Sequence, residues 1–210
     1  MSRWRATKRF NDVQPVTIEL PSMEFEKQEK EQVIYPISGN RLYFYSDVTR
    51  DSIFSLNRQI DELTKHLKFI QFSYNLPEPA PIELHISSEG GEVFPALSTV
   101  DKILSNSVPI YTHCEGIVAS AATLMSVVGK KRTISKNCCM LIHQVSSGMW
   151  GNYQQLKDEM QNLDLTMKII KNIYFKHTNF KESDLEDMLK KDLCLEPNDC
   201  LKLGLVDLIV

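Results

Sequence analysis

Apolar residues recur along the chain with two spacings, which predict helices and strands in alternation. Spacings of three and four residues predict helices over 51–72, 94–105, 120–128 and 152–177. Short apolar runs bounded by turn residues predict strands over 41–45, 82–86, 108–113, 132–135 and 139–143. Strands that alternate with helices in this way are typical of an α/β core with parallel strands and crossover helices.

The longest predicted helix, 152–177, carries two apolar stripes rather than one. One stripe consists of Leu156, Met160, Leu163, Met167, Ile170 and Tyr174, and the other of Leu165, Ile169 and Ile173. Two stripes indicate a helix contacted on two sides, by its own core and by a neighbour such as a second subunit. After it, a capping box over 183–186 predicts a short helix, and a second short helix over 197–203 is closed by Gly204 before a final strand over 205–210.

The first 40 residues differ from the rest and predict an N-terminal arm. They hold one short alternating segment over 16–20, which predicts a strand, and a charged run over 24–31, which indicates a solvated segment. The turn Ser38–Asn40 precedes the first compact strand. We therefore expect an arm over residues 1–40, with a role in gating or partner docking, and one folded domain over residues 41–210.

Composition excludes several classes of function. The net charge of −3, without a basic cluster interleaved with aromatic residues, argues against nucleic-acid binding. Five cysteines without C-x-x-C spacing argue against a disulfide framework and a zinc site, so we expect buried thiols, no metal and no cofactor. No apolar run reaches the roughly 20 residues of a membrane span, and the basic N-terminus lacks the apolar segment of a secretory signal. These features predict a cytoplasmic protein.

Ser120 stands out because it follows the small-residue stretch that begins at Gly116, interpreted as a turn, and because an apolar helical run begins directly behind it. A serine in this position can cap the helix by accepting from its first backbone amides. It can also be a nucleophile held at a tight turn, beside amides that receive an oxyanion. The stretch alone leaves both interpretations open, although the cap is the more common role.

Two other segments are candidates to meet Ser120. Gly90 and Gly91 follow a strand whose apolar pattern predicts burial. The double glycine is either a simple strand-to-helix turn or a place where the exposed backbone amide of Gly91 points at a carbonyl oxygen. His143 ends an apolar strand and so belongs at a sheet edge, where active groups of α/β proteins concentrate. The other histidines lack this setting: His66, His85, His113 and His177 lie within or at the end of predicted helices and strands. If Ser120 is a nucleophile, His143 is the best-placed base.

Four motifs, taken together and in order, resemble the proteolytic subunit of the Clp protease (ClpP). They are Glu89-Gly90-Gly91, Gly116-Ile117-Val118-Ala119-Ser120-Ala121-Ala122, Leu141-Ile142-His143-Gln144 and Gly204-Leu205-Val206-Asp207. The resemblance covers roughly residues 41–210. It implies that the chain is a divergent member of the family, of viral, plastid or bacterial type. It implies the ClpP/crotonase-like fold, a repeated β-β-α superhelix with a protruding long helix, the handle, and an N-terminal arm.

The resemblance also implies roles for five residues. Ser120 matches the nucleophile, His143 the general base, and Gly91 and Ala121 the two residues whose backbone N–H groups form the oxyanion hole. Asp192 is the match for the acidic member; a different gap would align Lys191 there instead, leaving the acid to Asp187 or to no residue. The family prolines of two motifs are replaced, by Glu89 and Val145, but no reacting group is lost.

The function that the resemblance implies is that of a serine endopeptidase subunit of a compartmentalised Clp-type protease, acting on unfolded proteins. Its expected partners are copies of itself in two stacked rings, a tetradecamer, and an AAA+ ATPase unfoldase; neither nucleic acid nor membrane is expected. The expected location is the cytoplasm, that of the host for a viral protein, or an organelle stroma or matrix. The alternatives are a catalytically impaired structural ring subunit, a capsid-maturation protease of a virus, and an acyl-CoA enzyme of the related crotonase fold.

Overall fold

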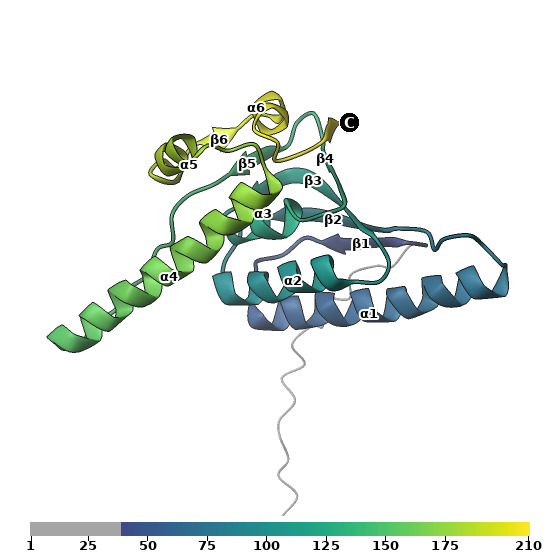
Figure 1. The fold of residues 1–210 in the computed structure, drawn as a ribbon, viewed down its shortest axis with the longest axis horizontal. Coiled ribbons are helices and arrows are strands. Elements are labelled where there is room, and N and C mark those ends of the chain that lie inside the picture. Colours follow the sequence, from purple (N-terminus) through teal and green to yellow (C-terminus); the bar gives the residue numbers. More distant parts are fainter. Residues whose placement is uncertain (1–38) are drawn as a thin grey trace, which may run out of the picture. The chain divides into compact units, whose positions relative to one another are not determined.

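The computed structural model describes residues 39–210 (Figure 1). The predicted strand over 16–20 and nearly all of the predicted arm lie outside these residues. The described elements are β1 (Arg41–Phe44), α1 (Arg50–Ser73), β2 (Ile82–Ser88), α2 (Val93–Ser105), β3 (Ile110–Ala119), α3 (Ala121–Ser126), β4 (Lys131–Ile134), β5 (Cys139–Leu141), α4 (Tyr153–His177), α5 (Glu182–Leu189), β6 (Cys194–Leu195), α6 (Pro197–Lys202) and β7 (Leu208–Ile209).

The strands form one sheet in which nearly all pairs are parallel. Its main path runs β1-β2-β3-β4-β7, and every pair along this path is parallel. Strand β5 pairs in parallel with β3, and β6 pairs antiparallel with β5. The prediction of an α/β core with parallel strands is therefore confirmed. The sequence pattern missed β6, because a strand of two residues carries no periodicity.

Strand β3 is longer than predicted and serves two neighbours. Its first part, from Tyr111 to Cys114, pairs with β4, and its last part, from Ile117 to Ala119, pairs with β5. The register with β2 shifts between these two parts, and Gly116 has a φ of 59° there. The predicted turn beginning at Gly116 is therefore wrong. This stretch is an irregular strand, in which glycine allows the local change of direction.

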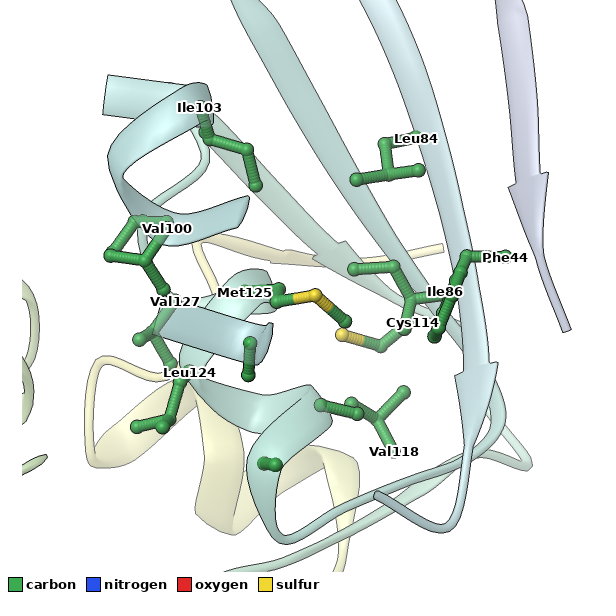
Figure 2. Close-up of a cluster of buried hydrophobic side chains, with 14 of the residues drawn as sticks. Phe44, Leu84, Ile86, Val100, Ile103, Cys114, Val118, Leu124, Met125 and Val127 are labelled. Carbon is green, nitrogen blue, oxygen red and sulfur yellow. The ribbon is translucent and has the colours of Figure 1, made fainter. Parts of the chain in front are cut away.

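The main core lies between one face of the sheet and the helices α1, α2 and α3. Leu42 and Phe44 of β1 and Leu84 and Ile86 of β2 are completely buried. Figure 2 shows Phe44, Leu84 and Ile86 in one cluster with side chains of α2 and α3. Alternate residues of a strand point to opposite faces, so the residues between them lie on the other face of the sheet. Parallel strands joined by helices bury such a face well, which explains the strict alternation of buried and half-buried positions in β2.

Helix α4 is only partly covered by the described residues. Its buried residues are Thr166, Ile170 and Tyr174, all in its second half. Apolar side chains of the first half remain accessible, with Met160 60% exposed and Leu165 58% exposed. The helix begins as predicted, because Asn152 accepts from the backbone of Gln155 and the Gln155 side chain accepts from the backbone of Asn152.

Two predictions near the C-terminus are wrong. The predicted capping box over 183–186 does not form: α5 begins at Glu182, its N-cap is Lys181, and no side chain caps it. Leu185 and Leu189 of this helix are buried, and Ser183 donates to the side chain of the neighbouring Asp184 instead of capping the helix. The final strand is also shorter than predicted, since only Leu208–Ile209 pairs with β4.

The cysteines are free but not all buried. Cys114, Cys138 and Cys200 are buried as expected, whereas Cys139 is half-buried and Cys194 is exposed. Cys194 lies on the two-residue strand that the sequence pattern did not predict, at the surface next to β5. Among residues 39–210, no helix has both the length and the apolar character needed to cross a membrane.

Candidate active site

Three segments meet where β2, β3 and β5 end. Because these strands run parallel, their carboxyl ends lie at the same edge of the sheet. Gly90 and Gly91 follow β2, Ser120 follows β3, and His143 follows β5 after one further residue. The backbone N–H of Ser120 donates to the carbonyl of Leu141 at 2.8 Å, which fixes the end of β3 against the end of β5.

Ser120 has an unusual backbone conformation. Its φ is 53° and its ψ is −126°, in a region that residues other than glycine rarely adopt and that costs roughly 1–3 kcal/mol. It precedes α3 directly, but its side chain makes no capping hydrogen bond. The interpretation of Ser120 as a helix cap is therefore wrong. The tight turn instead directs its hydroxyl away from the first amides of the helix.

The hydroxyl of Ser120 lies against His143. Its Oγ is 2.8 Å from Nε2 of His143, which is within hydrogen-bond distance. When Nε2 accepts from the hydroxyl, the ring proton resides on Nδ1, at the other side of the imidazole. This is the arrangement in which an imidazole can remove a proton from an alcohol.

Asp192 lies on the Nδ1 side of His143. Its Oδ1 is 3.5 Å from Nδ1, which is an ion-pair distance rather than a well-formed hydrogen bond, and its side chain is 82% exposed. The alternative acid, Asp187, pairs instead with Lys190 at 3.6 Å. Of the two aspartates considered from the sequence, Asp192 is the one that the structure brings to His143, loosely and at the surface.

Gly91 and Ala121 line the same pocket as Ser120 and His143. In the described part of the chain, neither N–H group donates a hydrogen bond to another residue. Gly91 has a φ of 140°, and an added Cβ would lie 2.3 Å from the carbonyl oxygen of Val48. A glycine is therefore required here, because any side chain would collide with the backbone of the segment that crosses it.

A cavity of about 60 Å³ connects these groups. Its lining contains Gly91, Ser120, Ala121 and His143, together with apolar and polar residues of α2, α3, α4 and the loop after β5: Val93, Leu124, Gln144, Val145, Ser146, Ile170 and Tyr174. Asp192 is not part of the lining. The pocket thus holds the hydroxyl of Ser120 and the imidazole of His143 next to an apolar wall.

The sequence analysis missed a hydrogen-bonded pair behind the serine. Thr123 Oγ1 donates to the carbonyl of Ser120 at 2.5 Å and lies 2.6 Å from the hydroxyl of Tyr174. Burial raises the pKa of Tyr174 above its ordinary value, although the hydrogen bond with Thr123 acts in the opposite direction. The sequence showed Tyr174 only as a member of an apolar stripe, and a helical threonine gives no signal of its own.

Comparison with known proteins identifies one family. The profile of the Clp protease family matches residues 38–210. Among curated proteins, the chain is similar to the ATP-dependent Clp protease proteolytic subunit of Deinococcus radiodurans. The two are 26% identical over 178 residues, an alignment that covers 82% of this chain and 87% of that protein.

Proposed function

The chain belongs to the Clp protease family, and we propose that it is a serine endopeptidase that cleaves unfolded proteins through an acyl-enzyme on Ser120. The observation that carries this proposal is the 2.8 Å separation of Ser120 Oγ and His143 Nε2. The strained backbone of Ser120 adds support, because such strain is kept where surrounding structure and function require it.

In the proposed reaction, His143 takes the proton of the Ser120 hydroxyl as the oxygen attacks the carbonyl carbon of the scissile bond. The oxygen of that carbonyl becomes an oxyanion, which the N–H groups of Gly91 and Ala121 stabilise. His143 then gives its proton to the leaving amine, and an acyl-enzyme remains on Ser120. A water molecule, deprotonated by His143, releases the acid product and restores the hydroxyl.

Asp192 is proposed to orient His143 and to stabilise the imidazolium that forms in each step. Its contribution is expected to be modest, because a carboxylate with 82% exposure is well solvated and interacts weakly with a charge at 3.5 Å. Partner subunits that exclude water from this region would strengthen the interaction.

Family membership also supports assembly into two stacked rings that receive unfolded chains from an AAA+ ATPase. The exposed apolar side chains in the first half of α4, among them Leu156, Met160 and Leu165, fit a surface that another subunit covers. We propose that α4 is the protruding handle of the ClpP-like fold and packs against the opposite ring. We also propose that the loop over 145–151 pairs with the opposite ring or with substrate. Family membership is likewise the basis for proposing a location in the cytoplasm or an organelle matrix.

The division into an arm over residues 1–40 and a peptidase domain over 41–210 is also a proposal. Deletion of residues 1–38 tests whether the arm gates entry or docks the ATPase. The variant is expected to keep cleavage of short peptides and to lose control over ATPase-dependent degradation of folded substrates. Unchanged degradation by the deletion variant would remove the arm from the proposal.

The decisive experiment is covalent labelling with a fluorophosphonate, which reacts only with an activated serine. Wild-type protein is expected to carry one label per chain, at Ser120, and Ser120→Ala is expected to carry none. Ser146→Ala is the matched control, since Ser146 lines the same cavity. His143→Ala should slow labelling strongly while leaving the protein folded.

The same experiment separates the alternatives. Absence of labelling on a folded, ring-forming wild-type protein would instead identify a structural ring subunit. Labelling and protein cleavage without any ATPase would favour a self-contained protease of the capsid-maturation type. Binding of acyl-CoA esters without cleavage of peptides would favour the crotonase-like alternative.

A further inference from the structure

A row of ring side chains crosses the sheet on the face opposite the main core. Tyr43 of β1 pairs in register with His85 of β2, and His85 pairs in register with His113 of β3. The ring centroids of neighbours in this row are 4.7 Å apart, and the rings are stacked. Parallel register places equivalent positions of adjacent strands side by side, so two imidazoles here face each other on a fixed backbone.

Each histidine has one ring nitrogen in contact with an oxygen. His85 Nδ1 lies 2.8 Å from Oε1 of Glu115, and the other oxygen of Glu115 accepts from the hydroxyl of Tyr45. His113 Nδ1 lies 2.5 Å from Oγ1 of Thr133, its neighbour on β4. These contacts fix the rotation of both rings and, for His85, place the ring proton on Nδ1.

The Nε2 atoms of His85 and His113 remain, and both are buried without a hydrogen-bond partner in the described part of the chain. A buried polar atom without a hydrogen-bond partner is unfavourable, so two in adjacent side chains call for an explanation. A lone pair on a neutral imidazole is a metal ligand, and a bound metal ion would satisfy both atoms at once.

Glu83 supplies a third donor. It lies two residues before His85 on β2 and therefore on the same face. One donor atom from each of Glu83, His85 and His113 lies within 4.8 Å of the other two. Arg41 pairs with Oε2 of Glu83 at 2.8 Å, which leaves the second carboxylate oxygen for another partner.

We propose that Glu83, His85 and His113 form a binding site for a divalent transition-metal ion of the zinc class. The site uses Nε2 of both histidines and one oxygen of Glu83. Two imidazoles and one carboxylate are a donor set that zinc accepts, with water in the fourth position. The contact of His85 Nδ1 with Glu115 is the outer interaction that orients a metal-binding histidine and raises its basicity.

Bonds of about 2.0–2.2 Å in a tetrahedron place donor atoms about 3.4 Å apart, and the three donors here lie within 4.8 Å of one another. The Glu83 side chain is 27% exposed, so its rotation can bring the carboxylate oxygen closer to the two rings. The expectation of no metal site rested on cysteine spacing, which does not take account of histidines on neighbouring strands.

The test is metal binding by the full chain after treatment with a chelator. We expect zinc, titrated against a colorimetric competitor, to bind at one equivalent per chain. Cobalt should give the visible bands of a four-coordinate nitrogen and oxygen site, without a thiolate charge-transfer band. Zinc should also raise the melting temperature, because a ligand that binds the folded state stabilises it.

The variants decide which residues bind the metal. The double variant His85→Gln/His113→Gln should bind zinc at least a hundredfold more weakly, and Glu115→Gln about 10- to 100-fold more weakly. His66→Gln, at an exposed position on α1, and Cys194→Ser, at the exposed cysteine, are the controls and should bind as the wild type does. Glu83→Gln provides a second test if the double variant does not fold, since the Glu83 side chain is 27% exposed. This variant should bind zinc at least tenfold more weakly.

Three results would overturn the proposal. They are no stoichiometric binding by the wild type, binding that the histidine and Glu83 substitutions leave unchanged, and binding that Cys194→Ser removes. Any of them would leave the two histidines as a stacked aromatic pair. The outcome does not depend on peptidase activity, because the site is built from residues outside the cavity that contains Ser120.

Discussion

Gly90 lies so close to Ser120 that no side chain could be added to it without moving the serine. A Cβ built on Gly90 would lie 2.6 Å from the Cβ of Ser120 and 2.7 Å from the carbonyl oxygen of Ala119. The φ of Gly90 is also positive, at 99°. The first glycine of the pair therefore allows the ends of β2 and β3 to lie in direct contact, and the second, Gly91, lines the pocket of Ser120.

We expect Gly90→Ala to damage the site more than the fold. The added methyl group should destabilise the protein by roughly 1–3 kcal/mol, through strain and overpacking. It should slow fluorophosphonate labelling of Ser120 by about a hundredfold, because a displacement of about 1 Å is enough to disturb a reacting geometry. Gly148→Ala is the control, since a Cβ there meets nothing within 4 Å. Labelling of Gly90→Ala at the wild-type rate would contradict the close packing.

Asp192→Asn tests how much an exposed acid contributes. Loss of a buried triad aspartate typically lowers kcat by about 10⁴-fold. Because Asp192 is 82% exposed and 3.5 Å from His143, we expect a decrease of less than about a hundredfold in peptide cleavage. The rate constants of wild type and variant, measured on the same short peptide, provide the comparison.

Asp187→Asn is the matched control for Asp192, because it removes a neighbouring carboxylate that pairs with Lys190. It should leave the rate of cleavage unchanged. A larger loss for Asp187→Asn than for Asp192→Asn would assign the acidic role to Asp187. A 10⁴-fold loss for Asp192→Asn would mean that Asp192 is buried in the assembled protein.

Tyr174→Phe tests the hydroxyl pair behind the serine. The substitution removes the partner of the Thr123 hydroxyl but keeps the ring that fills the pocket wall. We expect a decrease of about 1 kcal/mol in the free energy of unfolding, the usual contribution of one buried hydrogen bond. Urea unfolding measures it, and Tyr153→Phe, at a residue that is 81% exposed, should show no change. An equal effect of both substitutions would show that the pair adds no stability.

Asp207→Asn tests the contact that holds β7 and β4 together. Asp207 accepts from the Arg132 side chain and, at 2.8 Å, from its backbone N–H, while the guanidinium also donates to the carbonyl of Gly204. Arg132 is 15% exposed and Asp207 is 41% exposed. We therefore expect the free energy of unfolding to fall by about 1–2 kcal/mol. This is at the low end of the contribution of a hydrogen bond to a charged group, because water screens the aspartate.

The effect of Asp207→Asn should depend on pH. Burial opposes ionisation of Asp207, but the hydrogen bonds and charge of Arg132 outweigh it and lower the pKa below the ordinary 3.8. A carboxyl group whose pKa is lower in the folded than in the unfolded state contributes its full stabilisation of the fold at a pH above the unfolded pKa. This contribution is lost as the pH falls through the folded pKa. The difference between wild type and variant should thus be constant from pH 5 to pH 7 and shrink below about pH 3.8. Asp61→Asn, in the exposed pair with Lys102, should have a smaller effect at every pH. A difference that grows toward acid pH would contradict this account.

Most of the regular elements could be predicted from the sequence. The predicted helix over 51–72 is α1, and that over 152–177 is α4, because a long apolar periodicity is a local signal. Their exact limits and the shortest strands could not be predicted. The start of α5 at Glu182 carries no side-chain cap that the sequence could signal, and β6 exists only through its pairing with β5.

For the candidate site, the sequence determined the residue types and their order along the chain: a serine after small residues, a histidine after an apolar strand, and a double glycine. It also placed the double glycine and His143 at the ends of strands, whereas it placed Ser120 after a turn and not after a strand. It could not decide whether Ser120 caps its helix or faces a histidine, since both are compatible with the same local sequence. The tertiary structure decided this, because the parallel pairing of β3 with β5 brings His143 within 2.8 Å of the Ser120 hydroxyl.

The stacked pair of His85 and His113 also depends on the tertiary structure more than on the local sequence. The sequence placed each histidine within a strand, at positions separated by 28 residues, and gave no reason to connect them. Only the register of β2 against β3 stacks the rings and buries both Nε2 atoms. Local sequence determines which residues form a strand and which face each side chain takes. Proximity between strands depends on pairing and register, which the energy of the whole packed sheet decides.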